Sequence, residues 1–170
     1  MSKTQEAIIE EIVLDFQQGI IPTTTIREVA LEPLPNKATV CMGVRRSGKS
    51  TLMMQQVQRL ESSGVLRENM VYINLFDDRL HQLQELGLGI ILDVYYRLFP
   101  HKKGAEKVYF FFDELQVIPN WEPFIDRLMR TEVCEVYITG SSAQYLSKEI
   151  ATQMRGRALS WEVFPFSFTE

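Results

Sequence analysis

Residues 43–51 read GVRRSGKST, and this stretch decides the fold that the rest of the chain must build. It matches the pattern GxxxxGK[ST] in full, in which glycines let the backbone curl so that its N–H groups form a nest for anions. Residues 38–42 before it read as a short buried strand, and residues 52–61 after it read as a helix. The positive N-terminal end of that helix also favours phosphate. The stretch therefore predicts a phosphate-binding loop between a strand and a helix.

Each polar residue of this loop has an expected task. Lys49 would contact the β- and γ-phosphates of a nucleotide, and the hydroxyl of Ser50 would bind Mg²⁺. Arg45 and Arg46 stand where side chains usually point outward, so contact with phosphate, with a partner or with solvent all stay open. The predicted nucleotide-binding residues are Gly43, Arg45, Arg46, Ser47, Gly48, Lys49, Ser50 and Thr51.

Strands and helices alternate along the chain after residue 37. This order is typical of a parallel sheet with helices on both faces, so we predict an α/β fold, a three-layer α-β-α sandwich. In such sheets ligands bind beyond the carboxyl ends of the strands. The apolar patterns predict strands at 38–42, 71–76, 108–112, 133–138 and 159–164, and helices at 52–61, 80–99, 121–130 and 143–154, with Asn120 as the N-cap of the third helix.

Two carboxylates directly follow the apolar run from Val108 to Phe112. An ionised carboxylate at the end of a buried strand needs a partner, because leaving it unpaired away from water is very costly. Beside a phosphate loop, Mg²⁺ with its bound waters would be that partner for Asp113. Glu114 would then orient or deprotonate the water that attacks a γ-phosphate. The alternative is a pair of exposed acids where a strand meets a loop.

Hydroxyl and guanidinium groups near the last two predicted strands are further candidates for catalysis. Thr139 and Ser141 end the fourth strand, where a hydroxyl would hold the attacking water or the γ-phosphate, although Thr-Gly-Ser-Ser is also a natural turn. Arg155 and Arg157 precede the fifth strand, and a guanidinium there would neutralise charge on a transferring phosphoryl group. Such an arginine would reach the nucleotide of a neighbouring subunit. Two solvated arginines near a helix end are the alternative.

The overall composition is that of a folded protein without an electrostatic footprint for nucleic acid. Of the 170 residues, 45% are hydrophobic and 24% charged, and the formal net charge is −4. Cys41 and Cys134 have no metal-ligand or disulfide spacing, so reduced thiols are expected. Residues 1–16 read as an amphipathic helix and not as a signal peptide, and no apolar run has the length of a membrane span. We expect a soluble, cytoplasmic protein that does not enter membranes.

Five sequence blocks in this order resemble one family, the AAA+-like ATP-binding proteins of bacteria and archaea. The blocks are GVRRSGKST, YINLFDD, VYFFFDELQ, ITGSSAQYL and the closing RGRALSWEVFPFSFTE, and the resemblance covers about residues 25–170. It implies that Asp113 and Glu114 form the Walker B motif. Sensor 1 would contain Thr139 and Ser141, and the resemblance favours Arg157, which follows a glycine, as the arginine finger.

The resemblance also implies a strand order and the ligands. The sheet of the family runs 5-1-4-3-2, so the first and fourth strands would be neighbours, and Cys41 and Cys134 would lie near each other. The cofactors would be ATP and Mg²⁺; the choice of ATP over GTP rests on the resemblance alone. A homo-oligomer would form if Arg157 acts on a neighbouring subunit.

The resemblance divides the chain into residues 1–24, a helix and turn, and residues 25–170, a P-loop ATPase domain. Family members continue past the block at residues 165–170, so we expect a fragment of a longer protein that lacks its C-terminal domain and turns over slowly alone. The expected function is Mg-dependent ATP binding and hydrolysis, coupled to an attached or partner domain. A P-loop phosphotransferase and an ATP-binding switch with little hydrolysis stay open, although a glutamate after the Walker B aspartate suits water activation better than phosphoryl transfer.

Overall fold

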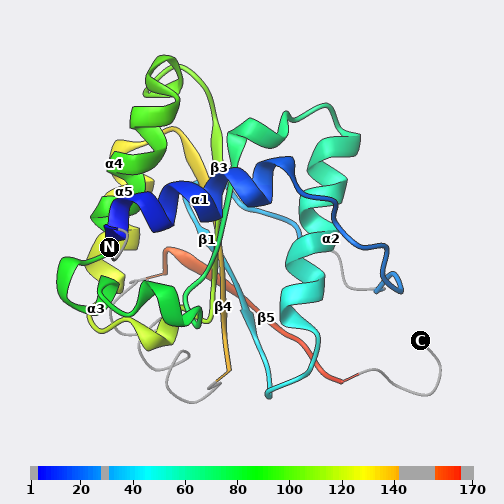
Figure 1. The fold of residues 1–170 in the computed structure, drawn as a ribbon. Coiled ribbons are helices and arrows are strands. Elements are labelled where there is room, and N and C mark those ends of the chain that lie inside the picture. The colour runs from blue at the N-terminus through cyan, green and yellow to red at the C-terminus, as the bar shows by residue number, and fades with distance from the viewer. Residues whose placement is uncertain (1–3, 28–30, 142–155, 166–170) are drawn as a thin grey trace.

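The computed structural model describes residues 4–27, 31–141 and 156–165. As far as residue 140 their strands and helices alternate as predicted, and the first helix precedes the sheet (Figure 1). The strands are β1 (Ala38–Met42), β2 (Met70–Asn74), β3 (Val108–Asp113), β4 (Cys134–Gly140) and β5 (Ala158–Glu162). The α-helices are α1 (Gln5–Gln18), α2 (Lys49–Ser62), α3 (Leu83–Leu86), α4 (Gly89–Leu98) and α5 (Glu122–Thr131).

The described strands form one five-stranded sheet in the order β2-β3-β4-β1-β5, and every neighbouring pair is parallel. Read from the other edge, this is the predicted order 5-1-4-3-2, which is confirmed. Because β4 is the central strand, with β3 and β1 on its two sides, and all three run the same way, the loops after β1, β3 and β4 all leave at one edge of the sheet. That edge carries the predicted phosphate loop and the predicted carboxylates.

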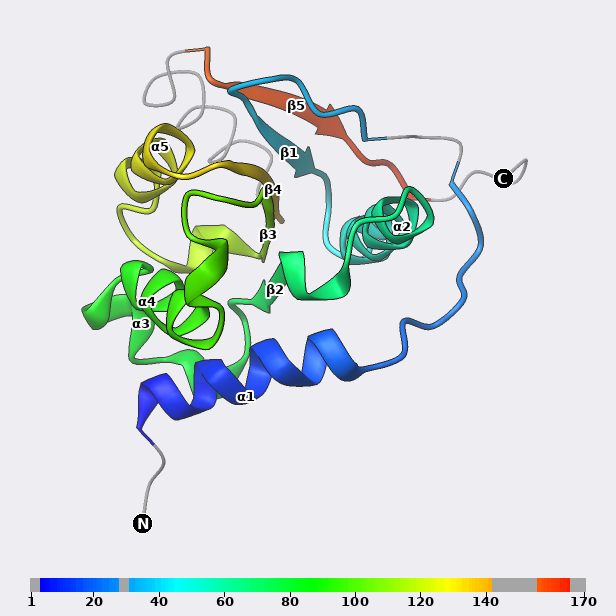
Figure 2. The same cartoon turned by 90° about the horizontal axis from the view of Figure 1, so that it is seen from above.

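Both faces of the sheet are covered, as the predicted three-layer sandwich requires. Successive phenylalanines of β3 alternate between the faces: Phe110 and Phe112 belong to one apolar cluster, and Phe111 belongs to the other. Helices α4 and α5 pack on the first face and α2 packs on the second (Figures 1 and 2). A strand buried on both sides reads as an unbroken apolar run, which explains the aromatic stretch in the sequence.

The N-terminal amphipathic helix is confirmed as α1, and it runs along the β2 edge of the sheet (Figure 2). Thr4 caps it by accepting a hydrogen bond from the backbone N–H of Ala7. Ile9 and Val13 are buried in the cluster that contains α4, while Phe16 packs against the cluster on the α2 face. In the part of the chain that the structure describes, no helix is both long and apolar enough to cross a membrane.

Two expectations about local structure are wrong, and a third falls outside the described residues. The helix predicted over residues 80–99 is broken, because Gly87 adopts φ 75° and ends α3 before α4 begins at Gly89. Asn120 is not a side-chain cap: its φ is 53°, and no side chain caps the first turn of α5. The helix predicted over residues 143–154 lies outside the described residues.

The two cysteines do not lie near each other, so that expectation is wrong. Strands β1 and β4 are neighbours as implied, but Cys41 pairs in register with Thr139, whereas Cys134 pairs with Val108 of β3. Cys134 and Thr139 are five residues apart along β4. At roughly 3.3 Å per residue, Cys134 and Cys41 are therefore about 16 Å apart in the strand direction. The thiols also pack in different clusters, on opposite faces of the sheet.

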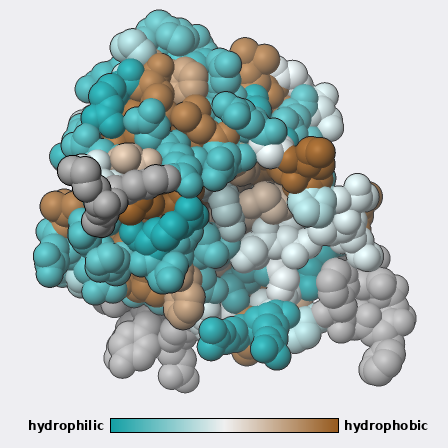
Figure 3. All heavy atoms as spheres, in the orientation of Figure 1, coloured by the Kyte–Doolittle hydropathy of each residue, from teal (hydrophilic) through white to brown (hydrophobic). Residues whose placement is uncertain are grey.

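The surface is mixed in character. On the face shown in Figure 3, hydrophilic side chains predominate and apolar ones form small groups between them. Several large apolar side chains of the described residues are nevertheless exposed, among them Ile20, Ile26, Val44, Phe76 and Phe164. Scattered exposure of this kind is ordinary for a folded protein.

Candidate functional site

The phosphate loop curls between the end of β1 and the start of α2, as its glycines allow. Gly48 adopts φ 86°, a left-handed conformation, and Gly43 lies so close to the backbone after β5 that a Cβ there would be 2.3 Å from the carbonyl oxygen of Val163. Lys49 begins α2 and is only 4% exposed. Its ammonium group donates to the carbonyl oxygens of Gly43 (3.0 Å) and Val44 (2.9 Å), so the cation sits within the loop.

Asp113 ends β3 and is met by hydroxyl groups from the strands on either side. The residue as a whole is 1% exposed. Tyr72 of β2 donates to Oδ2 at 2.6 Å, and Thr139 of β4 donates to Oδ1. The two hydroxyls satisfy a carboxylate that would otherwise be buried without partners. Thr139 was among the predicted residues, but Tyr72 was not.

Glu114 stands one residue further, in a left-handed conformation with φ 58°. Its backbone N–H donates to the hydroxyl oxygen of Thr139 at 2.9 Å. Its carboxylate accepts hydrogen bonds from the amide of Gln116 at 2.5 Å and from the hydroxyl of Ser141. Thr139 and Ser141, which the sequence did not separate, therefore differ in position: Thr139 joins the backbone of Glu114 to Asp113, and Ser141 contacts the Glu114 carboxylate.

Asp113, Glu114 and Ser141 line a cavity of about 360 Å³ at the carboxyl edge of the sheet. Two of its lining residues, Asn74 and Phe76, come from β2 and the turn after it and were not predicted, and the guanidinium of Arg45 lies over the Phe76 ring at 5.7 Å. The signal for them in the sequence is the YINLFDD block, which carries the family resemblance but predicts no site residue. The remaining lining residues are Ser50, Asp113, Glu114, Gln116 and Ser141.

The donor groups present fit a nucleotide with a magnesium ion. The hydroxyl oxygen of Ser47 is buried in the loop and has no hydrogen-bond partner among the described residues. Ser50 and Asp113 supply oxygen ligands at the same cavity. Mg²⁺ in such sites is held by few protein oxygens together with phosphates and water, so a dense ligand cluster is not required. Within residues 4–27, 31–141 and 156–165, none of the His, Cys, Asp and Glu residues form such a cluster of three or more.

A family model described as AAA domain matches residues 35–170. The chain belongs to this AAA domain family. At the level of the family it is therefore a P-loop, nucleotide-binding ATPase domain, and both the parallel sheet and the loop after β1 agree with that membership.

Relatives of this AAA domain occur in an archaeon and in a bacterium. It is 34% identical over 167 residues to an uncharacterized protein of Methanocaldococcus jannaschii, covering 98% of this chain and 35% of the relative. It is also 34% identical over 133 residues to an uncharacterized protein of Haemophilus influenzae, covering 77% of this chain and 32% of that protein. The chain thus spans about one third of the length of both relatives.

A solved structure shares the fold. The structure of C. elegans PCH-2 is similar to this AAA domain with a TM-score of 0.52 and 15% sequence identity, over 93% of this chain and 41% of that chain. At this identity the likeness concerns the fold alone.

The electrostatics of the AAA domain site are set by burial and by the Asp113 charge. Burial raises the pKa of the Tyr72 hydroxyl, the nearby Asp113 charge raises it further, and a hydrogen bond with Ser50 acts in the opposite direction. Tyr72 therefore keeps its proton and remains a donor to Asp113. Burial, and then the charge of Asp113, raises the pKa of the Cys41 thiol to about 12, so this cysteine behaves as a small apolar residue.

Arg157 lies at the opposite edge of the sheet, where the strands begin. Its backbone carbonyl accepts from the N–H of Ala38 at the start of β1, and its guanidinium pairs with Asp126 of α5. The side chain is 53% exposed. Strand β1 separates it from the loop of its own AAA domain. Arg155 lies outside the described residues.

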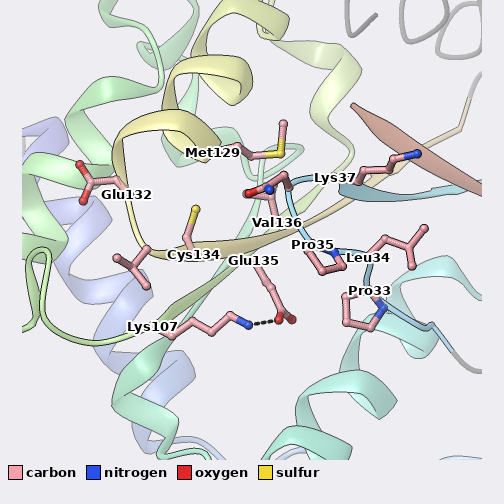
Figure 4. Close-up of a pocket in the computed structure, with 12 residues that line it drawn as sticks. Pro33, Leu34, Pro35, Lys37, Lys107, Met129, Glu132, Cys134, Glu135 and Val136 are labelled. Carbon is pink, nitrogen blue, oxygen red and sulfur yellow. Dashed lines mark hydrogen bonds and ion pairs between the residues drawn. The ribbon is translucent and has the colours of Figure 1, made fainter. Parts of the chain in front are cut away.

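A second cavity, of about 300 Å³, lies at this opposite edge and is shown in Figure 4. Its lining includes the ion pair of Lys107 with Glu135 and the thiol of Cys134. Burial, followed by the charges of Glu132 and Glu135, raises the pKa of that thiol to about 12. A thiol that stays protonated is a poor nucleophile, so Cys134 is a packing residue in this AAA domain.

Proposed function

We propose that this AAA domain binds Mg·ATP at the loop 43–51, hydrolyses the γ-phosphate and couples the cycle to an attached or partner domain. The observation that supports the proposal best is the meeting of three elements at one cavity: Ser50 from α2, Asp113 and Glu114 from the end of β3, and Ser141 from the end of β4. An ATPase needs phosphate, metal and water ligands within a few ångströms of one another, and this cavity supplies candidates for all three.

The phosphates would be bound by the loop and its lysine. Lys49 already sits inside the loop, with its ammonium group on two carbonyl oxygens, and a short side-chain movement would transfer it to the β- and γ-phosphates. Gly43, Ser47, Gly48 and Thr51 would complete the cradle with backbone N–H groups, and the positive end of α2 would favour the same charges. Arg45 would reach the mouth of the site and Arg46 would face outward.

Ser50 and Asp113 would hold the metal, Asp113 directly or through water. When bound there, Mg²⁺ would draw charge from the phosphate oxygens. Glu114 would orient or deprotonate the attacking water, and Ser141, which donates to its carboxylate, would keep it aimed. Thr139 would hold both acids in place, because its hydroxyl contacts Asp113 and the backbone of Glu114.

One contact favours slow hydrolysis, the switch-like alternative. The Glu114 carboxylate accepts from both Gln116 and Ser141, so its oxygen is engaged before any water arrives. Both donors bond Oε2, so a proton or water at Oε2 must compete with them, whereas Oε1 carries neither of these two hydrogen bonds. We propose that turnover is low in the isolated domain and rises when a partner or the rest of a longer protein shifts these contacts.

The test uses two variants with matched controls. Lys49→Ala should weaken ATP binding about 100-fold or more, because a charge-assisted contact to phosphate is lost, whereas Lys37→Ala, an exposed lysine before β1, should bind normally. Glu114→Gln should retain Mg·ATP binding but release phosphate about 10²–10⁴-fold more slowly, whereas Glu85→Gln should not change turnover. Calorimetry and a phosphate-release assay measure the two effects.

Nucleotide binding at the loop and hydrolysis assisted by Glu114 are tested independently of each other. Tight ATP binding by the Lys49 variant would mean that the loop is not the site. Unchanged phosphate release by the Glu114 variant would remove this residue from the mechanism, while leaving nucleotide binding intact.

A further inference from the structure

Arg27 is a buried cation beside the phosphate loop, although it precedes the residues that match the family model. Its side chain is 3% exposed. One end of the guanidinium, Nη2, donates to the carbonyl oxygen of Ser47 inside the loop at 2.6 Å, and Nη1 donates to the carbonyl oxygen of Phe164, after β5, at 2.8 Å. A single side chain therefore joins the loop to the segment that leaves the sheet.

The bond to Ser47 fixes the orientation of one peptide group in the loop. In a planar trans peptide the C=O and the N–H point to opposite sides. When Arg27 holds the carbonyl of Ser47, the N–H of Gly48 must face away from Arg27. An anion nest requires its N–H groups to share one direction, toward the ligand, while the carbonyls point out. Arg27 binds one of these outward carbonyls.

Gly48 fits the same arrangement. A Cβ on this residue would lie 2.8 Å from Nη2 of Arg27, and its φ of 86° is one that other residues rarely adopt. The glycine thus serves two purposes, the curl of the loop and the close approach of the guanidinium. A lysine would not replace the arginine fully, because the two carbonyls are bonded by two different nitrogens of the guanidinium and a lysine has a single terminal nitrogen.

Helix α2 holds Arg27 from the other side. The backbone N–H of Arg27 donates to the side-chain oxygen of Gln55 at 3.3 Å, and the amide of Gln55 donates to the hydroxyl of Thr24 at 3.0 Å and the carbonyl of Thr25 at 2.6 Å. Gln55 is itself buried. The segment before β1 is therefore anchored on α2, the helix that follows the loop. This anchoring fixes the backbone from which the Arg27 side chain extends.

We propose that Arg27 is a positioning residue for triphosphate binding: it aims the Gly48 N–H into the loop and ties the loop to the chain after β5. The role rests on the proposed function, because it concerns the same phosphate site. Because Arg27 bonds both Ser47 and Phe164, a ligand that moves the loop would also displace the backbone at Phe164. Phosphate binding would thereby change the position of the segment that follows β5.

The test compares Arg27→Lys and Arg27→Gln with Arg67→Gln. Arg67 is a suitable control, because its guanidinium also holds backbone carbonyls, those of Phe16 and Gly19, but far from the loop. Amide hydrogen exchange of residues 43–49 is measured by NMR in nucleotide-free protein. Affinity for Mg·ATP and for sodium tripolyphosphate is measured by calorimetry.

Both Arg27 variants should exchange the Gly48 amide faster and bind ATP and tripolyphosphate about tenfold more weakly, whereas Arg67→Gln should leave both unchanged. Unaltered exchange at Gly48 in Arg27→Lys, or equal loss of affinity in the Arg67 variant, would overturn the proposal. If Arg27→Gln does not fold, Arg27→Lys decides alone. If the unmodified protein binds neither ligand, the proposed ATPase function fails, while the exchange result still decides whether Arg27 orients the loop.

Discussion

At the scale of single residues, the fate of Asp113 shows how a buried charge is accommodated. Sequence reasoning expects a cation as its partner, and the structure adds two hydroxyl donors, Tyr72 and Thr139, from the neighbouring strands. Such donors hold the carboxylate in one orientation while leaving lone pairs for a metal or its waters. Tyr72 stands two positions before Asn74, the register partner of Asp113, so the parallel pairing of β2 with β3 brings its hydroxyl to the carboxylate.

Tyr72→Phe should raise the Mg²⁺ concentration required for half-maximal ATP binding several-fold, because Asp113 loses one of the donors that orient it. The loss should also reduce the free energy of unfolding by about 1–3 kcal/mol. The ring is retained, so its contact with Phe16 at 5.5 Å between centroids stays. Magnesium titrations and urea unfolding measure both effects. Tyr95→Phe, whose hydroxyl contacts Glu68 away from the site, is the control, and an equal magnesium effect there would count against Tyr72.

The free energy of unfolding should also depend on pH through the hydroxyl of Tyr72. The pKa of Tyr72 in the folded protein lies above its ordinary value of 10.0, because burial and Asp113 disfavour the phenolate. Above pH 10 the unfolded chain therefore releases this proton while the folded protein keeps it, so stability falls as the pH rises further. Below pH 10 the hydrogen bond to Asp113 should be unaffected by the titration of Tyr72.

At the scale of elements, the break between α3 and α4 is the clearest departure from the sequence pattern. Residues 80–99 carry a helical apolar pattern, and a glycine inside a helix costs only about 1 kcal/mol, so the pattern alone does not place the break. In the structure α3 ends at Leu86, Gly87 follows in a left-handed conformation, and α4 begins at Gly89, while Leu83, Leu88 and Ile91 on the two sides of the break all lie in one buried cluster.

Gly87→Ala should lower the free energy of unfolding by about 1 kcal/mol, because an alanine must adopt the left-handed φ of 75°. Space is not the obstacle, since a Cβ at residue 87 would meet nothing within 4 Å. Gly89→Ala is the matched control: its Cβ would lie 3.3 Å from the flexible end of Arg127, and its backbone is helical, so stability should be equal or higher. Thermal unfolding compares the two. Equal losses would contradict strain at residue 87.

At the scale of the whole molecule, the parallel sheet separates two edges that carry candidate functional residues. The phosphate loop and the carboxylates lie where the strands end, and Arg157 lies where they begin, paired with Asp126. A guanidinium at that edge contributes to a nucleotide site only when a second molecule brings its loop alongside. The exposed ion pair with Asp126 costs little to break, because solvent screens it.

Arg157→Ala should leave ATP binding and stability nearly unchanged and slow turnover only at protein concentrations where molecules associate. Turnover per subunit is measured over a range of concentrations, together with the mass in solution. Arg130→Ala is the control, since this residue lines the same surface cavity as Arg157. If turnover per subunit does not depend on concentration in the unmodified protein, an arginine acting on a neighbour is excluded.

Much of the fold could be predicted from the sequence, because the type of each strand, loop and helix depends mainly on residues that are close together in the chain. The strand, loop and helix around GVRRSGKST, the alternation of elements and the strand order implied by resemblance are all confirmed. Among the candidate site residues, the sequence predicted those that sit at strand ends, such as Asp113 and Thr139. It did not predict Tyr72, Asn74 or Arg27, because their relevance depends on which strand or helix lies beside them and no spacing in the chain encodes that.

The amino-acid sequence by itself determined the phosphate loop, the apolar strand with its terminal acids and the alternation that predicts a parallel sheet, since each depends on residues close together in the chain; the strand order was implied by the resemblance. Only the tertiary structure decided the partners of the buried charges: hydroxyls of two neighbouring strands for Asp113, and carbonyls of the loop and of the segment after β5 for Arg27. The physical reason is that a buried polar group is satisfied by whatever the fold places within about 3 Å of it, and in both cases those groups are distant in sequence.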